Sequence, residues 1–290
     1  MSHDVSLVTS LVYRTVAGDD LLADLYLPDT ALPPPVVVYV HGGGWAQGSR
    51  SDHGSTRLAA IAGSGLAVLS IDYRLVHQAH FPAQVHDVKA AVCWIKEHGD
   101  EYGLDVHRVG IWGASAGAVL AALAGLTAGH DDWDQDSRES GCTSDVHAVV
   151  FWFGISDFAA TTTRSALEAL LMPDGPEAAF LGLNSGTEVT EHPQIAQRAS
   201  PLHWVHAAAP PFLIAHGDRD RMVPLSESVA LHAALSRAGA QSTLLTLGGA
   251  GHEDTAFDTA ANLAVTAGFL LATLGRSAQR TTNPEQEPHS

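Results

Sequence analysis

One serine of this chain is flanked by small residues, in the segment Gly113-Ala114-Ser115-Ala116-Gly117. The segment follows a short apolar run that ends at Trp112 and precedes a stretch rich in alanine, which is the strand–turn–helix context that a G-x-S-x-G motif requires. Small neighbours permit the tight turn that exposes the hydroxyl, and the helix start places its positive dipole end where negative charge develops in acyl transfer. The pattern predicts that Ser115 is a nucleophile; the alternative is that it only caps the helix.

A serine hydroxyl needs a base to take its proton, and the base needs a carboxylate that fixes its tautomer. Two loops downstream can supply them. The apolar run 212–215 is followed by Asp218 and Asp220, and the run 243–247 is followed by a glycine-rich loop that ends at His252. Serine, aspartate and histidine in this order form one of the three known chain orders of a serine triad. Both aspartates remain candidates for the acid at this point.

The segment His41-Gly42-Gly43-Gly44-Trp45 directly follows the apolar run 36–40. Glycines at such a place let backbone N–H groups come close to a substrate oxygen. Together with the N–H of Ala116, they predict an oxyanion hole, whereas the alternative is a glycine-rich turn without a ligand. Trp45 is expected either to line an acyl pocket or to cover the edge of the core.

Strand and helix patterns alternate along the chain and indicate how these residues are positioned. Apolar runs predict strands at 6–14, 21–27, 36–40, 66–71, 109–112, 148–153, 212–215 and 243–247. Helical patterns lie at 53–63, from Pro82 onwards, and at 115–128, 225–238 and 258–273. The alternation predicts an α/β fold with a doubly wound, mostly parallel sheet, and the first two strands, joined by the turn 17–20, predict an antiparallel hairpin.

Residues 156–206 interrupt this alternation with four prolines and short helical pieces, and predict a helical insertion over the carboxyl edge of the sheet. We expect one domain over residues 1–275 and a disordered tail over 276–290, where apolar anchors are scarce.

Fifteen basic and 32 acidic residues give a net charge of −17, which argues against nucleic acid and anionic membranes as partners. The two cysteines, Cys93 and Cys142, are too few for a disulfide framework, and with no recognisable signal peptide they favour a reduced, cytoplasmic location. The apolar stretch 116–128 is too short to cross a bilayer and is expected to be a buried helix. Seventeen histidines show no metal-ligand spacing, and we expect His41 and His216 to hold loops by hydrogen bonds.

Taken together, these motifs resemble those of the α/β-hydrolase superfamily. The resemblance extends from about Asp24 to Leu274 and lies in the branch of HGGG-type carboxylesterases, which includes hormone-sensitive-lipase-like enzymes and the bacterial carboxylesterase and feruloyl esterase group. It is carried by HGGGW, GASAG and four further segments, 70–75, 81–84, 87–91 and 102–105. The acid of this family lies in a His-Gly-x-x-Asp-x-x-Val-Pro pattern, which selects Asp220 and leaves Asp218 as a loop cap. By the same resemblance, Gly43 and Gly44 donate N–H groups to the oxyanion.

The resemblance implies a serine carboxylesterase that hydrolyses short-acyl esters of small molecules through an acyl-enzyme, with no metal or cofactor. An arylformamidase or other amidase is the alternative, because the same triad serves both reactions. A second alternative is a dinucleotide-binding protein, since Gly42, Gly44 and Gly48 followed by Asp72 imitate a nucleotide fingerprint, although the spacing departs from it. The sequence does not determine the oligomeric state, for which a homodimer stays open.

Overall fold

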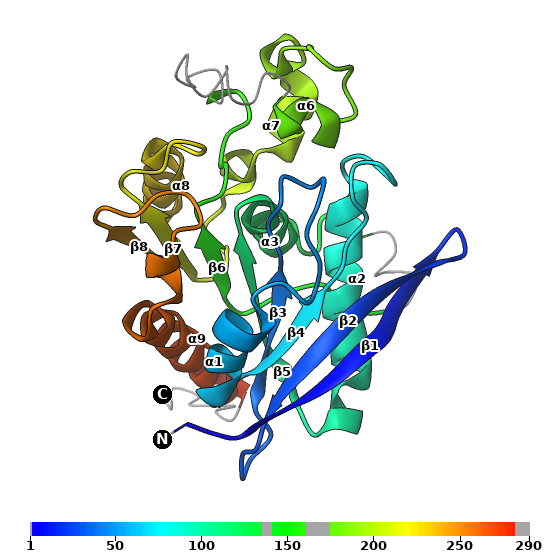
Figure 1. The fold of residues 1–290 in the computed structure, drawn as a ribbon, viewed down its shortest axis with the longest axis vertical. Coiled ribbons are helices and arrows are strands. Elements are labelled where there is room, and N and C mark those ends of the chain that lie inside the picture. The colour runs from blue at the N-terminus through cyan, green and yellow to red at the C-terminus, as the bar shows by residue number, and fades with distance from the viewer. Residues whose placement is uncertain (1, 135–140, 161–174, 282–290) are drawn as a thin grey trace, which may run out of the picture.

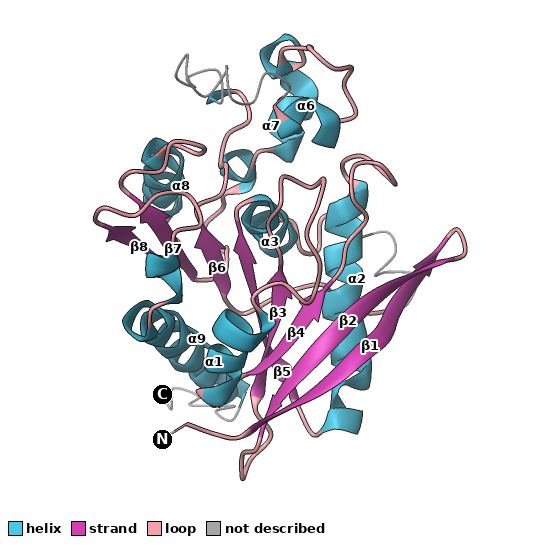
Figure 2. Ribbon diagram, viewed as in Figure 1, coloured by secondary structure: helices cyan, strands magenta, loops and turns pink. Residues whose placement is uncertain are grey.

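A mixed sheet crosses the molecule, and helices cover both of its faces (Figures 1 and 2). The computed structural model describes residues 2–134, 141–160 and 175–281. The strands of the described part are, in chain order, β1 (Val5–Val16), β2 (Asp19–Pro28), β3 (Pro35–Val40), β4 (Ala67–Ile71), β5 (Asp105–Ala114), β6 (Val149–Trp152), β7 (Phe212–Gly217) and β8 (Ser242–Leu247). Each of the expected strands is therefore present, and β5 begins earlier than predicted.

The strands lie in the order β1-β2-β4-β3-β5-β6-β7-β8. β2 pairs antiparallel with both β1 and β4, and all the other pairs are parallel. This confirms the α/β-hydrolase fold and its N-terminal hairpin. Because the carboxyl ends of parallel strands share one edge, the loops after β3, β5, β7 and β8 meet there.

Most of the helices lie on one or the other face of the sheet. They are α1 (Ala59–Gly63), α2 (Ala83–His98), α3 (Ala116–Leu126), α6 (Pro176–Phe180), α7 (Pro193–Ala199), α8 (Leu225–Ala238) and α9 (Ala260–Thr281), with short turns η1 (Gly54–Leu58), η2 (Gly99–Tyr102), η4 (Val189–Glu191), η5 (Pro201–Trp204) and η6 (Thr255–Asp258). Side chains of α2, α3 and α8 share one core cluster, and those of α1 and α9 share the other. β3 shows why both are needed, because Val36, Val38 and Val40 face the first cluster while Val37 and Tyr39 face the second.

α3 is buried along its whole length, as its uniformly apolar sequence predicts. Among the helices of the described residues, none combines the length and the apolar character that a membrane span requires.

The structure describes part of the expected insertion and part of the expected tail. Within the described part of 156–206, α6, α7, η4 and η5 lie beyond the carboxyl edge of the sheet and no strand occurs (Figure 1). α9 continues to Thr281, so its backbone extends the last expected helix into the segment 276–290 that was expected to be disordered. Residues 282–290 lie outside the described part.

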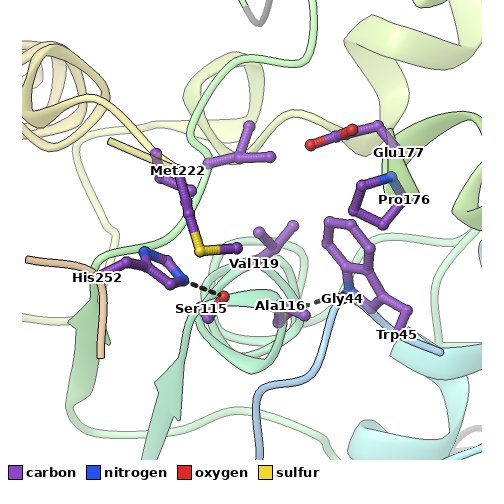
Figure 3. Close-up of a pocket in the computed structure, with 11 residues that line it drawn as sticks. Gly44, Trp45, Ser115, Ala116, Val119, Pro176, Glu177, Met222 and His252 are labelled. Atoms are coloured by element: carbon purple, nitrogen blue, oxygen red, sulfur yellow. Dashed lines mark hydrogen bonds between the residues drawn. The ribbon is translucent and has the colours of Figure 1, made fainter. Parts of the chain in front are cut away.

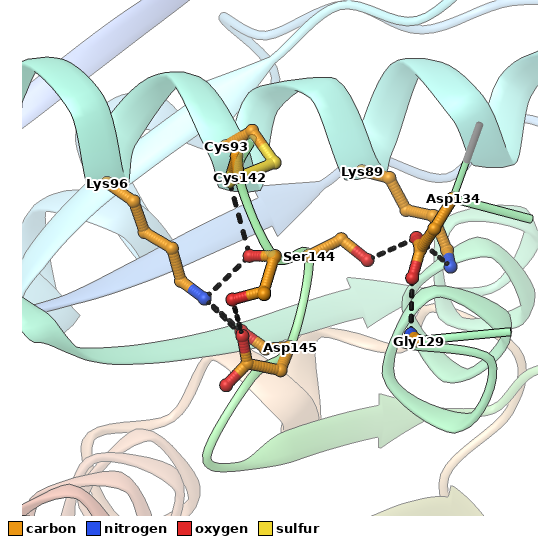
Figure 4. The surroundings of a disulfide bond; sticks show 9 residues. Lys89, Cys93, Lys96, Gly129, Asp134, Cys142, Ser144 and Asp145 are labelled. Carbon is orange, nitrogen blue, oxygen red and sulfur yellow. Dashed lines mark hydrogen bonds and ion pairs between the residues drawn. A yellow bond between two sulfur atoms is a disulfide. The ribbon is translucent and has the colours of Figure 1, made fainter. Parts of the chain in front are cut away.

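The two cysteines, which the sequence showed to be too few for a disulfide framework, nevertheless form one disulfide. Cys93 of α2 forms a disulfide with Cys142, across 49 residues of sequence and with the two Cα atoms 5.8 Å apart. Spacing along the chain could not reveal this, because the segment after α3 folds back along α2 (Figure 4). The number of cysteines therefore no longer favours a reducing compartment.

Two lysines of α2 hold the same returning segment on either side of the disulfide (Figure 4). The Lys89 Nζ atom lies 2.7 Å from a carboxylate oxygen of Asp134, and Lys96 Nζ lies 2.7 Å from one of Asp145. Lys89 and Asp134 are both buried, and each has a further hydrogen bond: Lys89 donates to the Thr127 carbonyl, and Asp134 accepts from the Ser144 hydroxyl. These additional hydrogen bonds offset the free-energy cost of burying the ion pair.

Candidate active site

Ser115 lies in the turn between β5 and α3, where the backbone leaves the sheet sharply. Its φ of 54° and ψ of −120° belong to a sparsely populated region for a residue with a side chain. A Cβ atom on Gly113 would collide with the backbone of Gly117, and one on Gly117 would collide with the carbonyl group of Val40. Both glycines are therefore required for the turn that exposes the Ser115 hydroxyl.

The structure brings together Ser115, His252 and Asp220, the three residues that the sequence proposed as a triad. The Ser115 Oγ atom lies 2.9 Å from Nε2 of His252, and Nδ1 of His252 lies 2.6 Å from Oδ2 of Asp220. A carboxylate only accepts, so Nδ1 carries the proton and Nε2 is left to accept from the serine hydroxyl. This is the geometry of a nucleophile, a general base and an orienting acid.

Asp220 is held as an anion by its surroundings. Its side chain is fully buried, and burial alone would raise the pKa of the carboxyl group. Hydrogen bonds from His216 and His252, and one from the backbone N–H of Val223, outweigh burial and hold the pKa of Asp220 well below its ordinary value. The competitor Asp218 lies elsewhere in the loop, where it accepts a hydrogen bond of 2.6 Å from the N–H of Gly249. Its expected role as a loop cap is confirmed.

The glycine loop after β3 runs beside Ser115. A Cβ atom on Gly42 would lie 3.3 Å from the Ser115 Cβ atom, so this loop passes close to the serine. Gly43 and Gly44 have positive φ values of 108° and 59°, and a side chain on Gly43 would collide with the carbonyl group of Gln47. Within the described residues, the N–H groups of Gly43, Gly44 and Ala116 donate to no other group.

A pocket of about 60 Å³ opens at Ser115 (Figure 3). Its described lining residues are Gly44, Trp45, Ser115, Ala116, Val119, Ile155, Pro176, Glu177, Met222, Val223 and His252. Trp45 lines this pocket and, at only 2% exposed, also belongs to the core. Its Nε1 atom donates to the Ala116 carbonyl at 3.1 Å, which ties the glycine loop to the first turn of α3.

Comparison with known proteins agrees with this arrangement. A family model described as BD-FAE matches residues 23–235. The chain belongs to the BD-FAE family. The matched segment contains Ser115 and Asp220, and His252 follows it.

Several proteins that are similar to this chain are esterases. Esterase LipC of Mycobacterium tuberculosis is 37% identical over 76% of this chain and 53% of its own length, so the chain spans about half of that relative. A solved truncated carbohydrate esterase from gut microbiota is 28% identical with a TM-score of 0.79, covering 94% of this chain and 98% of that one. Esterase Est2 of Thermogutta terrifontis, solved with propionate bound, is 26% identical with a TM-score of 0.68, covering 96% and 93%.

His216 helps to hold Asp220, and its precise partners could not be derived from sequence. Nε2 of His216 donates to the Val223 carbonyl at 2.9 Å, and Nδ1 lies 2.7 Å from the Ser228 hydroxyl. The same Nε2 lies 3.2 Å from Oδ2 of Asp220. His216 thus fulfils its expected loop-holding role and also contacts the acid. His41 fulfils the same expectation more simply, with Nδ1 2.8 Å from the Gly42 carbonyl oxygen.

A second group of residues lies beside His252, and no sequence pattern pointed to it. Glu253 follows His252 with a φ of 52°, and its carboxylate lies 3.2 Å from Nε2 of His53. The hydrogen bond from His53 lowers the pKa of Glu253, burial opposes this, and the charge of Arg57 reinforces it. Arg57 is completely buried, and its Nε lies 2.7 Å from a carboxylate oxygen of Asp258. No motif signals this cluster, because its members lie far apart in the chain.

The other residues that the sequence singled out have structural roles. Trp152 and Phe153 fill the core, as expected, and the Phe153 ring also contacts the His252 ring at 5.0 Å. Asp72, the acid of the imitated nucleotide fingerprint, accepts hydrogen bonds from Arg50 at 2.6 and 2.7 Å. Gly42 of that fingerprint lies beside Ser115, and the first helical turn after these glycines starts only at Gly54. Nucleotide binding therefore receives no support.

Proposed function

We propose that this protein is a serine carboxylesterase that hydrolyses esters of short carboxylic acids through an acyl-enzyme intermediate. The observation that carries the proposal is the pair of hydrogen bonds from Ser115 through His252 to Asp220, beside a pocket with mostly apolar walls. The relatives described above are esterases, which supports ester hydrolysis and gives no support to an arylformamidase or another amidase.

In the proposed reaction, His252 takes the proton of Ser115 as its Oγ attacks the ester carbonyl carbon. The charge of Asp220 stabilises the imidazolium that forms. When the tetrahedral intermediate collapses, His252 returns the proton to the leaving alcohol, and the acyl group stays on Ser115. A water molecule, deprotonated by His252, then attacks the acyl-enzyme and releases the acid.

The carbonyl oxygen becomes an anion in each tetrahedral intermediate and needs hydrogen-bond donors. We assign this role to the N–H groups of Gly43, Gly44 and Ala116. These groups lie around Ser115, and among the described residues they donate to no other acceptor. Loss of one such donor typically costs about 2.7–4 kcal/mol of transition-state stabilisation. Each step is supplied by side chains and N–H groups, so we expect activity to persist in EDTA.

The preference for short acyl groups is supported by the size of the pocket. Its volume of about 60 Å³ is bounded by Trp45, by Pro176 of α6 and by Met222, which leaves room for a small group next to Ser115. The propionate bound to Est2 is a short acid of this kind. We therefore propose small-molecule esters as substrates, with the insertion over residues 156–206 as part of the same domain.

Hydrolysis of p-nitrophenyl esters from acetate to dodecanoate tests this function, with the Ser115→Ala variant as the blank. We expect kcat/KM to be highest between acetate and butyrate and serine-dependent throughout. Activity that persists in Ser115→Ala would contradict the nucleophile. Absence of turnover on the whole series, with turnover on N-formyl aromatic amines, would replace the esterase by the amidase.

A further inference from the structure

One acidic side chain stands out in the pocket wall. Apart from Ser115 and His252, the described lining residues are apolar or contribute backbone, except Glu177 of α6. Its carboxyl group points from α6 into the pocket, on the side away from His252 (Figure 3). Glu177 is only 5% exposed, so its carboxyl group is a component of the pocket and not of the outer surface.

The helix that carries Glu177 is fixed against the catalytic centre. The ring of Phe180, three residues further on, stacks on Trp45 with the ring centres 4.2 Å apart, and its carbonyl accepts a hydrogen bond of 2.8 Å from the N–H of Phe81. A Cβ atom on Gly44 would lie 3.3 Å from Pro176, so α6 begins directly beside the glycine loop. Glu177 therefore has a defined position relative to Ser115.

A substrate that fills the pocket comes against this carboxyl group. An alkyl chain offers it no hydrogen-bond donor, whereas a polar group that donates to a buried acceptor gains binding free energy. A carboxyl group has about four lone-pair sites, so a hydrogen bond made elsewhere leaves acceptor sites for a substrate. A hydroxyl group fits these demands better than an ammonium group, because a cation is costlier to remove from water.

We propose that Glu177 is a specificity-determining residue that accepts a hydrogen bond from a substrate hydroxyl, and that the preferred substrates are short esters with a hydroxyl group near the ester bond. The proposal rests on the esterase function proposed above. It adds a requirement that the triad does not impose, since Ser115, His252 and Asp220 act on any ester that reaches them.

Matched pairs of esters test the proposal on the two sides of the ester bond. For the acyl side, p-nitrophenyl butyrate is compared with the 2-hydroxy- and 3-hydroxybutyrates; for the alcohol side, propyl butyrate is compared with 2,3-dihydroxypropyl butyrate. We expect the wild type to prefer the hydroxylated member of at least one pair by on the order of tenfold in kcat/KM, the gain expected for a hydrogen bond to a buried acceptor.

The variant Glu177→Leu should abolish this preference, by raising kcat/KM for the plain ester and lowering it for the hydroxylated one. Glu177→Gln keeps an acceptor oxygen and should retain part of the preference. Glu191→Gln, which changes an exposed glutamate of the same insertion, should leave the ratio as in the wild type.

Two failures can be told apart. Turnover of plain butyrates without any hydroxyl preference, or a preference that Glu177→Leu leaves intact, would overturn the role of Glu177 and leave the esterase standing. Absence of serine-dependent turnover on all of these esters would overturn the proposed function itself, and the role of Glu177 with it.

Discussion

Nε2 of His216 lies 3.2 Å from Oδ2 of Asp220, the same oxygen that accepts from Nδ1 of His252. The other oxygen, Oδ1, accepts from the N–H groups of Met222 and Val223, each at 2.9 Å. Asp220 is thus held from several directions, which leaves its carboxylate one orientation in which to hold the base.

His216 is therefore predicted to be a positioning residue. The variant His216→Phe should lower kcat by about 10- to 100-fold with KM little changed, since small misplacements of a catalytic group have effects of this size. Ser228→Ala, which removes only the partner of the His216 Nδ1 atom, should have a smaller effect in the same direction. Steady-state kinetics with thermal unfolding curves would check this. A rise in KM with unchanged kcat would instead place His216 in substrate binding.

The choice of the acid is tested by a pair of variants in one loop. Asp220→Asn should reduce kcat by on the order of 10⁴-fold, because an amide favours the wrong tautomer of the base. Asp218→Asn should change kcat less than about tenfold, because Asp218 only accepts a hydrogen bond from the Gly249 N–H. The larger loss in Asp218→Asn would reverse the assignment.

The free energy of unfolding should depend on the ionisation of Asp220 at acid pH. The pKa of Asp220 is depressed in the folded state, so its contribution to stability is fully present above the unfolded value of about 3.9 and is lost as the pH falls through the folded value. The free energy of unfolding of the wild type should therefore fall relative to that of Asp220→Asn below about pH 4. Urea unfolding between pH 6 and pH 3 measures the difference. Parallel curves would mean that the pKa of Asp220 is not depressed.

Arg57 should stabilise the loop that carries the base. It donates to the carboxylate of Asp258 and, at 3.0 Å, lies within hydrogen-bond distance of the Tyr39 hydroxyl. Arg57→Met should lower the free energy of unfolding by about 2–4 kcal/mol, somewhat less than for a fully buried pair because Asp258 is 24% exposed at its side chain. It should also lower kcat, since Glu253 adjoins His252. Arg57→Lys should recover part of the loss; wild-type stability in Arg57→Met would refute the role.

The disulfide should stabilise the fold by restricting the unfolded chain. Reduction should lower the free energy of unfolding by about 2–4 kcal/mol, as expected for a closed loop of this length. Urea unfolding with and without a reductant measures this, and a Cys93→Ser/Cys142→Ser double variant should be insensitive to the reductant. Equal stability of the oxidised and reduced wild type would count against the bond.

Local pattern indicated most of the fold and the three residues of the proposed triad. Strand and helix periodicity depends on residues close in sequence, and each proposed catalytic residue lies in the turn or loop after a strand whose end the pattern marks. Ser115, His252 and Asp220 could therefore be chosen by type and order, although the last of these needed a family pattern to be separated from Asp218.

Contacts between distant segments were decided only by the tertiary structure. The pairing of Cys93 with Cys142, the burial of Arg57 against Asp258 and the entry of Glu177 into the pocket each join residues that no local pattern relates. Which partners meet depends on how α2, α6 and the loop after β8 pack on the sheet. The sequence by itself thus determined the chemistry that the site offers, whereas packing decided what surrounds that chemistry and which substrates can reach it.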